Sequence, residues 1–337
     1  MARILRYAKF AEESEFAESP APSPDITVDI ASANMDTPSD TQQIWDGGIG
    51  RGQRLHRPGY YSTSGNVVVA VDVHTVAWFL RWALGGYAYT SEGGDGDLHL
   101  HEFWGVTDTV LPTFATWLGK DVFEHRFEGC SISQLQLEVS DGYAQVTLDL
   151  VGGRDARETI DQSVLDQLPL PPPLTFPAFR VWLGGTDAGD ERSASIQSLQ
   201  LTINNNLDAA AARGLGSRFP QRPIPAGGRD TTLQLTAWYD STEHIERVWG
   251  DSSGPTDAGS VELPMRISAD SGDDGSIQID LPRVLVTQVQ TQPSNRSRID
   301  QQINATALLD EITLEDASEV ESEIVVRLEN DMSDLEA

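Results

Sequence analysis

Two histidines and three carboxylates gather where the chain could hold a metal ion. His99 and His101 lie two residues apart in a run that predicts a β-strand, so both side chains would point to one face of it. Asp95, Asp97 and Glu102 are close in sequence, and zinc accepts imidazole and carboxylate ligands. No further ligand has a diagnostic spacing, so packed or solvent-facing histidines are favoured and no metal is predicted.

Two other segments carry oxygen-bearing side chains. Residues 270–275 (Asp-Ser-Gly-Asp-Asp-Gly) hold the ligand type that calcium prefers, but they lack the twelve-residue loop with a final Glu. Asp and Gly are also the usual turn residues between strands, so a turn is favoured. Residues 250–255 (Gly-Asp-Ser-Ser-Gly-Pro) are similar to the nucleophile segment of chymotrypsin-like proteases, yet Ser253 replaces the second Gly and no His has the matching context.

The single cysteine, Cys130, excludes an intrachain disulfide and any cysteine-based zinc or redox motif. It follows Gly129 at the start of a strand-like run, where a small buried side chain is expected rather than a reactive thiol. No phosphate loop and no dinucleotide-binding fingerprint occurs. Since no acid, base and nucleophile come together either, we predict that the protein is not an enzyme and has no catalytic residue, metal or cofactor.

The chain is strongly acidic. Its 337 residues include 52 Asp and Glu against 23 Lys and Arg, so the formal net charge is −29, and only Lys9 and Lys120 are lysines. This sign disfavours nucleic acids and anionic membranes as general binding partners. Many carboxylates with little lysine favour a protein from concentrated salt, and an acidic protein of ordinary habitat is the alternative. No apolar run approaches a membrane span, and no secretory signal is expected.

Alternating and β-branched runs predict a mainly β chain with short helices. In the first half the strand-like runs are 26–30, 67–71, 98–104, 114–118, 122–127, and 132–139 with 146–150 as a hairpin around Asp141-Gly142. Residues 74–84 predict a short apolar helix that Gly85-Gly86 ends. The proline-rich residues 161–177 predict a linker.

The second half follows a similar plan. Its strand-like runs are 196–203, 231–239, 261–267, 276–281, 284–290 and 299–308. Ser241-Thr242 caps a short helix over 243–249. The acidic tail from Asp310 contains one strand-like piece, 324–328. The expected domains are a first β unit (1–160), the linker (161–177), a second β unit (178–310) and an acidic C-terminal segment (311–337).

The order of these features indicates an internal duplication. In each half a Gly-rich loop leads into a strand and then, through Asp72 or Asp240, into a short Trp-bearing helix that ends in Gly. The matching pieces are Gly48–Arg51 before Asn66–Val69, and Gly214–Ser217 before Asp230–Leu233. Chance similarity of Gly-rich loops and strands is the alternative explanation.

Arginines concentrate in the two Gly-rich loops. They are Arg51, Arg54 and Arg57 in the first loop, and Arg213, Arg218, Arg222 and Arg229 in the second. Basic loops on an acidic body would let copies of the chain join through complementary charge. These seven residues are therefore the predicted inter-subunit contacts, and charge balancing within one subunit is the alternative.

Several segments, in order, carry a resemblance to a known family. They are Arg6–Phe16, Val67–Gly86, Phe127–Leu135 with its Gly-Cys pair, and Leu199–Leu207 followed by Arg213–Gly216. Over roughly residues 3–310 the chain resembles the major tail tube proteins of long-tailed (siphovirus-like) phages and haloarchaeal tailed viruses. The proline-rich linker and the acidic tail match nothing in that pattern.

The resemblance implies a structural virion protein with a tail-tube-type β-sandwich or barrel. Subunits of this family form rings that stack into a tube for genome delivery, and the family has no catalytic residues to transfer. Two duplicated ring-forming units would let three chains make a pseudo-sixfold ring, which is favoured over a hexamer. The implied partners are the chain itself, other tail proteins, and viral DNA that passes the lumen without specific binding. Synthesis in the host cytoplasm and no membrane contact are implied as well.

A second hypothesis is a secreted or cell-surface halophilic β-sandwich binding protein. It would explain the acidity, the strands and the glycosylation sequons at Asn295 and Asn304, but no signal peptide supports it. Self-assembly separates the two hypotheses, because a binding module would stay small.

Overall fold

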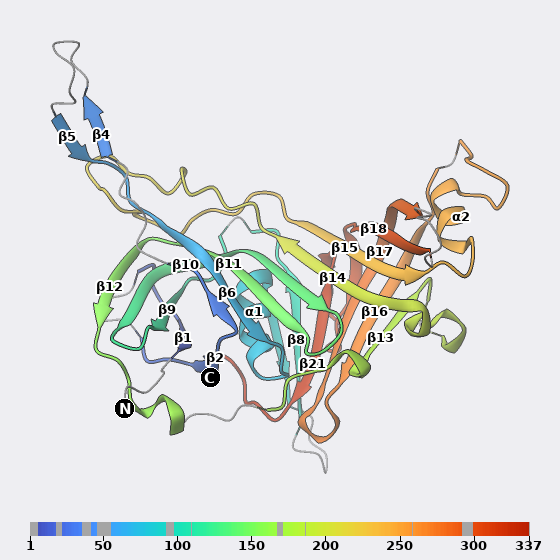
Figure 1. The fold of residues 1–337 in the computed structure, drawn as a ribbon, viewed down its shortest axis with the longest axis horizontal. Helices are drawn as coiled ribbons and strands as arrows, with labels where there is room; N and C mark the ends of the chain where they lie inside the picture. Colours follow the sequence, from blue (N-terminus) through green and yellow to red (C-terminus); the bar gives the residue numbers. More distant parts are fainter. Residues whose placement is uncertain are drawn as a thin grey trace.

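The structure is a computed structural model. It describes residues 6–17, 22–35, 42–45, 55–91, 98–108, 110–166, 171–185, 187–257, 259–291 and 299–336. Antiparallel strands dominate this part of the chain, and all of them except two small hairpins belong to one hydrogen-bonded network. The expected mainly β architecture with short helices is confirmed. Figure 1 shows two β bodies side by side, joined by long strands through the middle of the molecule.

The first body, on the left in Figure 1, contains the elements of the N-terminal half. They are β1 (Tyr7–Glu12), β2 (Ile26–Asp29), β3 (Ser32–Ala33), β6 (Thr63–Ala70), α1 (Thr75–Leu84), β9 (Phe114–Gly119), β10 (Glu124–Val139), β11 (Gln145–Gly152) and β12 (Arg154–Glu158). Two hairpins extend it, namely β4 (Gln42–Trp45) with β5 (Leu55–Pro58), and β7 (Gly85–Thr90) with β8 (His99–Gly105).

The second body, on the right, contains the elements of the C-terminal half. They are β13 (Phe179–Leu183), β14 (Ile196–Asn204), β15 (Asp230–Trp238), α2 (Glu243–Trp249), β16 (Glu262–Asp270), β17 (Ser276–Thr291) and β18 (Asp300–Ala307). The C-terminal residues add a hairpin and one more strand, β19 (Asp310–Thr313), β20 (Glu319–Ser322) and β21 (Val325–Asn330). Both helices predicted from the sequence are confirmed to within one residue.

The two bodies share one pattern of strand pairing. In the first body the antiparallel order is β1–β9–β10–β11–β6–β3. In the second body the order β13–β16–β17–β18–β15–β14 repeats it strand for strand. The helix also has the same place in the chain, since α1 follows β6 and α2 follows β15. The similarity that the sequence indicates in its loops, strands and helices therefore extends to the hydrogen-bonded ladders.

β10 and β17 are each 16 residues long, and they correct the expectation of two shorter strands in each place. Both strands are irregular in the middle but continuous. Gly129 has a φ of 62° where the register of β10 against β9 shifts, and Pro282 lies where the register of β17 against β16 shifts. Glycine tolerates a positive φ and proline lacks an N–H, so both residues belong at such irregularities.

β10 and β21 join the two bodies. The C-terminal half of β10 pairs with β14, so that Leu135 lies opposite Ile203 and Leu137 opposite Leu201. β21, from the acidic C-terminal segment, lies between β8 of the first body and β17 of the second. The division of the chain at residues 161–177 stays a prediction, and the strand-like piece expected in the acidic segment is confirmed as β21.

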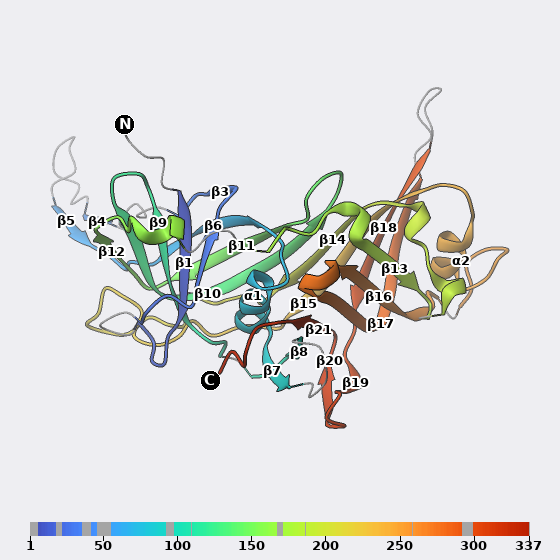
Figure 2. The same ribbon diagram turned by 90° about the horizontal axis from the view of Figure 1, so that it is seen from below.

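α1 contributes its apolar side to the core. Its core-facing side chains have helical spacing and are buried: Val76, Phe79, Leu80 and Ala83. Asp72 accepts hydrogen bonds from the backbone N–H groups of His74 (2.9 Å) and Thr75 (2.8 Å), which would otherwise lack partners at the helix start. Gly85 ends the helix with a φ of 84°. Figure 2 shows α1 on one side of the long sheet, with β7, β19 and β20 on the same side.

Candidate assembly surfaces

The two histidines on β8 make contacts within the chain. Nδ1 of His101 accepts a hydrogen bond from the Tyr87 hydroxyl at 3.0 Å, and Nε2 donates to the carbonyl oxygen of Met332 at 3.2 Å. Nδ1 of His99 contacts a second tyrosine hydroxyl on β7. In the described part of the chain no group of three or more His, Cys, Asp or Glu could hold a metal ion, and residues 95–97 lie outside it.

Burial lowers the pKa of His101, whose residue surface is 0% exposed. The folded state therefore prefers the neutral imidazole. The stability that the neutral His101 contributes is fully present above the pKa of the unfolded state, about 6.5, and is lost as the pH falls below it. We expect His101→Gln to flatten the loss of stability between about pH 7 and about pH 5, measured by the urea midpoint. His99→Gln on the same strand is the matched control, and equal slopes for wild type and His101→Gln would contradict the assignment.

The other segments singled out for chemistry have structural roles. Between β16 and β17 the N–H of Gly272 donates to Asp270 Oδ1 at 2.7 Å, and the expected turn is confirmed. After α2, Asp251 Oδ1 accepts the N–H of Ser253 at 2.8 Å and closes a loop within its own segment. Cys130 is fully buried, and burial raises the pKa of its thiol, so it is a small core residue as expected.

The second Arg-rich loop is held by contacts within the chain. Arg229 forms an ion pair with Glu323, and its Nη1 donates to the carbonyl oxygen of Val106 at 3.2 Å. Arg218 and Arg222 each donate from Nε to a backbone carbonyl oxygen at 3.2 Å. These hydrogen bonds join the arginine side chains of the loop to backbone oxygens of the loop itself and of the first body.

The two Arg-rich loops meet on the first body. The Arg213 guanidinium lies over the Tyr60 ring, 4.3 Å from its centroid, and the rings of Tyr61 and Phe219 meet edge to face at 5.4 Å. Figure 1 shows the segment between β14 and β15 running along the first body toward β5, where Arg57 is exposed. Two of the predicted contact residues lie outside the described residues: Arg51 and Arg54. The inter-subunit role of all seven arginines stays a prediction.

A surface of mostly uncharged polar side chains crosses both bodies. We call it the polar sheet face, and it follows the strand order β6–β11–β10–β14–β15–β18–β17. One cross-strand row consists of Val68, Thr147, Gln136, Thr202, Thr232 and Thr306. The next row consists of Gln145, Glu138, Gln200, Gln234, Asn304 and Gln288. Leu285 and Ala70 complete these two rows, which contain one carboxylate in a chain with a net charge of −29. The adjacent row on the same face contains two more, Asp149 and Asp230.

The polar sheet face does not stand out in the sequence, although the alternation that produces it is present. Gln and Thr alternate with apolar residues in most of these strands, and the alternating apolar side chains are buried in the core on the opposite face. The pattern becomes one surface only when the strands of both bodies are placed side by side.

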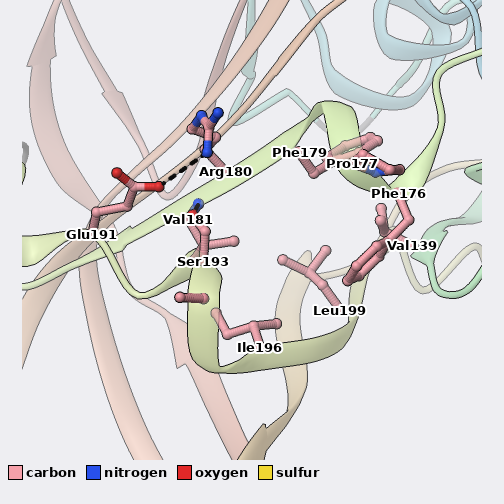
Figure 3. A pocket seen from close by; sticks show the side chains of 11 residues that line it. Val139, Phe176, Pro177, Phe179, Arg180, Val181, Glu191, Ser193, Ile196 and Leu199 are labelled. Carbon is pink, nitrogen blue, oxygen red and sulfur yellow. Dashed lines mark hydrogen bonds and ion pairs between the residues drawn. The ribbon is translucent and has the colours of Figure 1, made fainter.

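A groove of about 280 Å³ lies where the two bodies meet. Figure 3 shows Val139, from the end of β10, and Phe176, from the turn before β13, beside Leu199 of β14. An ion pair of 3.4 Å between Arg180 and Glu191 lies at the other end of the groove. Side chains from the first body and from the turn before β13 thus pack against the second body.

Comparison with known proteins gives a family for the chain and adds to the description of its fold. In the described part of the chain, no helix combines the length and apolar character that crossing a bilayer requires. No curated protein matches the sequence. A family model described as phage tail tube protein matches residues 6–307 of the 337. Because this match covers most of the chain, the resemblance is confirmed, and the chain belongs to the phage tail tube protein family.

Proposed function

We propose that the chain assembles into rings that stack into the tail tube, the conduit for genome delivery. Membership in the tail tube family makes it a structural virion protein that associates with itself and with other tail proteins. The observation that supports the finer proposal is the repeated strand pairing, because each chain presents two bodies of one design. Three chains then supply six such bodies, so we favour a trimeric ring with pseudo-sixfold symmetry over a hexamer.

Electron cryo-microscopy of the assembled polymer tests this proposal. The acidic composition leads us to propose that the tube works in concentrated salt, so assembly is assayed in multimolar sodium chloride. We expect stacked rings with threefold symmetry in which the two bodies alternate. Identical units in true sixfold symmetry would contradict the trimer. Single chains without filaments at every salt concentration would contradict the tube.

We also infer that the polar sheet face lines the lumen, where amides, hydroxyls and a few carboxylates give DNA no strong binding site. We expect Gln136→Arg combined with Gln200→Arg to slow genome release, because added cations hold phosphates. The measurement is the rate of DNA release from particles that carry the variant tube. Gln136→Asn with Gln200→Asn is the matched control, and unchanged release from the arginine variant would contradict the assignment.

The first Arg-rich loop supports a separate prediction about polymerisation. Replacing Arg51, Arg54 and Arg57 with Ala is expected to leave the subunit folded and to prevent tube formation, because the loop would lose the charge that meets an acidic neighbour. Sedimentation measures the polymer and circular dichroism the fold. Arg283→Ala, at an exposed ion pair of the second body, is the control. Tubes of normal length from the triple variant would show that this loop is not the connector.

A further inference from the structure

We propose that the outer half of β17 pairs with the β3 edge of a second copy of the chain. This contact would repeat, between copies, the pairing that β10 makes with β14 inside one chain. It rests on the proposed ring, and it specifies which edges meet and in what register.

Cross-strand rows show which strands are equivalent. In the first body one row crosses β3, β6, β11 and β10 at Ala33, Val67, Leu148 and Leu135. In the second body the corresponding row crosses β14, β15, β18 and β17 at Leu199, Leu235, Ile303 and Val289. β3 therefore takes the place of β14, and β17 takes the place of β10.

The segment of β10 that enters the internal junction is repeated in β17. Residues 132–137 read Ile-Ser-Gln-Leu-Gln-Leu, and residues 286–291 read Val-Thr-Gln-Val-Gln-Thr. The register of each strand against its partner skips the second residue of this segment, Ser133 in β10 and Thr287 in β17. The two segments share sequence pattern and bulge, so their residues correspond one to one.

The two segments differ in what covers them. Leu135 is 2% exposed and Leu137 is 4% exposed beneath the pairing with β14. Their counterparts, Val289 and Thr291, are only partly buried. Among the described residues β17 beyond Leu285 pairs with β18 alone, and β3 pairs with β6 alone. Unpaired edges present backbone donors and acceptors to another strand, and these two lie at opposite ends of one sheet.

A groove on the first body is placed to receive the neighbouring chain. It measures about 530 Å³ and is lined in part by Ile30, Ala33 and Lys120. The counterparts of Ile30 and Ala33 are Ile196 and Leu199, which line the groove of about 280 Å³ in Figure 3. That second groove has Val139, from the end of β10, in its wall. Among the described residues, no strand end of the second body inserts into the groove on the first body, and the end of β17 from a second copy would supply one.

Pairing of β17 with β3 is a contact between unlike surfaces. Such head-to-tail contacts close into a ring when the rotation between successive units fits, and otherwise they give open helices. The β10–β14 junction sets the rotation between the two bodies of one chain. The same junction between chains would continue that rotation.

Disulfide trapping in assembled tubes tests the contact. Leu137 lies opposite Leu201 in the internal junction, and their counterparts are Thr291 and Met35. We expect Met35→Cys with Thr291→Cys to yield disulfide-linked dimers and trimers on non-reducing gels, whereas a mixture of the two single variants yields dimers only. Leu137→Cys with Leu201→Cys, which would bond within one chain, is the positive control. The natural thiol of Cys130 is fully buried.

A second substitution does not depend on altering the buried Met35. Thr291→Lys is expected to leave the unfolding midpoint of the subunit unchanged and to reduce tube yield at least tenfold, because a charge would be buried between copies.

The disulfide experiment also needs a control for the strand register. Met35→Cys with Leu285→Cys provides it, because Leu285 lies earlier along β17 than Thr291 and is expected to give less disulfide.

The outcomes separate this contact from the ring itself. Three results would overturn the contact but not the ring. They are normal tubes without a disulfide between the Met35 and Thr291 positions, an equal yield of disulfide from the Leu285 variant, and normal tubes from Thr291→Lys. Failure of the unsubstituted chain to form tubes would overturn both.

Discussion

A chain that ends at Ser322 is expected to lose the cooperative unfolding transition of the full-length protein. The truncation removes β21, whose side chains Val325, Val326 and Leu328 are each 0% exposed. Burial of such a side chain stabilises a fold by about 1.5–3 kcal/mol, so the three together approach the 5–15 kcal/mol that is typical of a whole domain. The edges of β8 and β17 that β21 now covers would also become unpaired.

Loss of Arg327 adds an electrostatic cost to the same truncation. Its guanidinium contacts Glu102 at 3.0 Å and Asp280 at 2.8 Å. Glu102 is 1% exposed, and a buried carboxylate without its cation is strongly destabilising. We expect the loss of the buried β21 side chains and of the Arg327 ion pairs to leave a collapsed chain without a defined urea midpoint.

The matched control for this truncation is a chain that ends at Asn330. It keeps β21 and removes only the last residues, including Met332 and Glu336, which contact His101 and Arg81. We expect this control to unfold cooperatively with a slightly lower midpoint. Circular dichroism during urea titration at constant salt measures both chains. Cooperative unfolding of the shorter chain at the full-length midpoint would show that β21 does not hold the two bodies together.

Trp82→Ala is expected to lower the free energy of unfolding by about 3–5 kcal/mol, the range for removing a buried large aromatic side chain. Trp82 is 0% exposed and stacks on Phe114 with 4.5 Å between the ring centroids. Its indole N–H donates to Glu12 Oε2 at 2.9 Å, so the substitution also removes a donor from a carboxylate. The cavity would lie where α1 packs against β1 and β9.

Trp78→Ala on the same helix is the control for this prediction. Trp78 is only partly buried at the margin of the core, so its loss is expected to cost less than half as much. Urea unfolding of both variants at one salt concentration gives the comparison. A change below about 1 kcal/mol for Trp82→Ala would be within the effect of an ordinary substitution and would contradict the central role of this stack.

Local patterns in the sequence were enough to predict many of the elements. An apolar run ended by Gly85-Gly86 predicted α1, and Ser241-Thr242 with the following Gly250 predicted α2. The Asp-Gly pair predicted the hairpin of β10 and β11. These features depend on residues that are close in the chain. The same local reasoning divided β10 and β17, because Gly129 and Pro282 look like strand ends. Pairing with β9 and β16 carries each strand through the irregularity.

The candidate surfaces were predicted less completely, because they depend on distant partners. Arg229 forms an ion pair with Glu323, which lies 94 residues further along the chain, and no local pattern predicts such a partner. Its role between copies stays a prediction. The polar sheet face needs the registers of seven strands, and a shift by one residue would turn each Gln or Thr toward the core.

The sequence by itself determined the β class, the acidic charge and the family, because composition, alternation and motif order are properties of the linear chain. Only the tertiary structure decided that β10 meets β14, that β21 lies between the two bodies, and that β3 and β17 are the outer edges of one sheet. Strand register is set by hydrogen bonds and side-chain packing between segments far apart in sequence, so local preferences do not specify which edges remain for another copy.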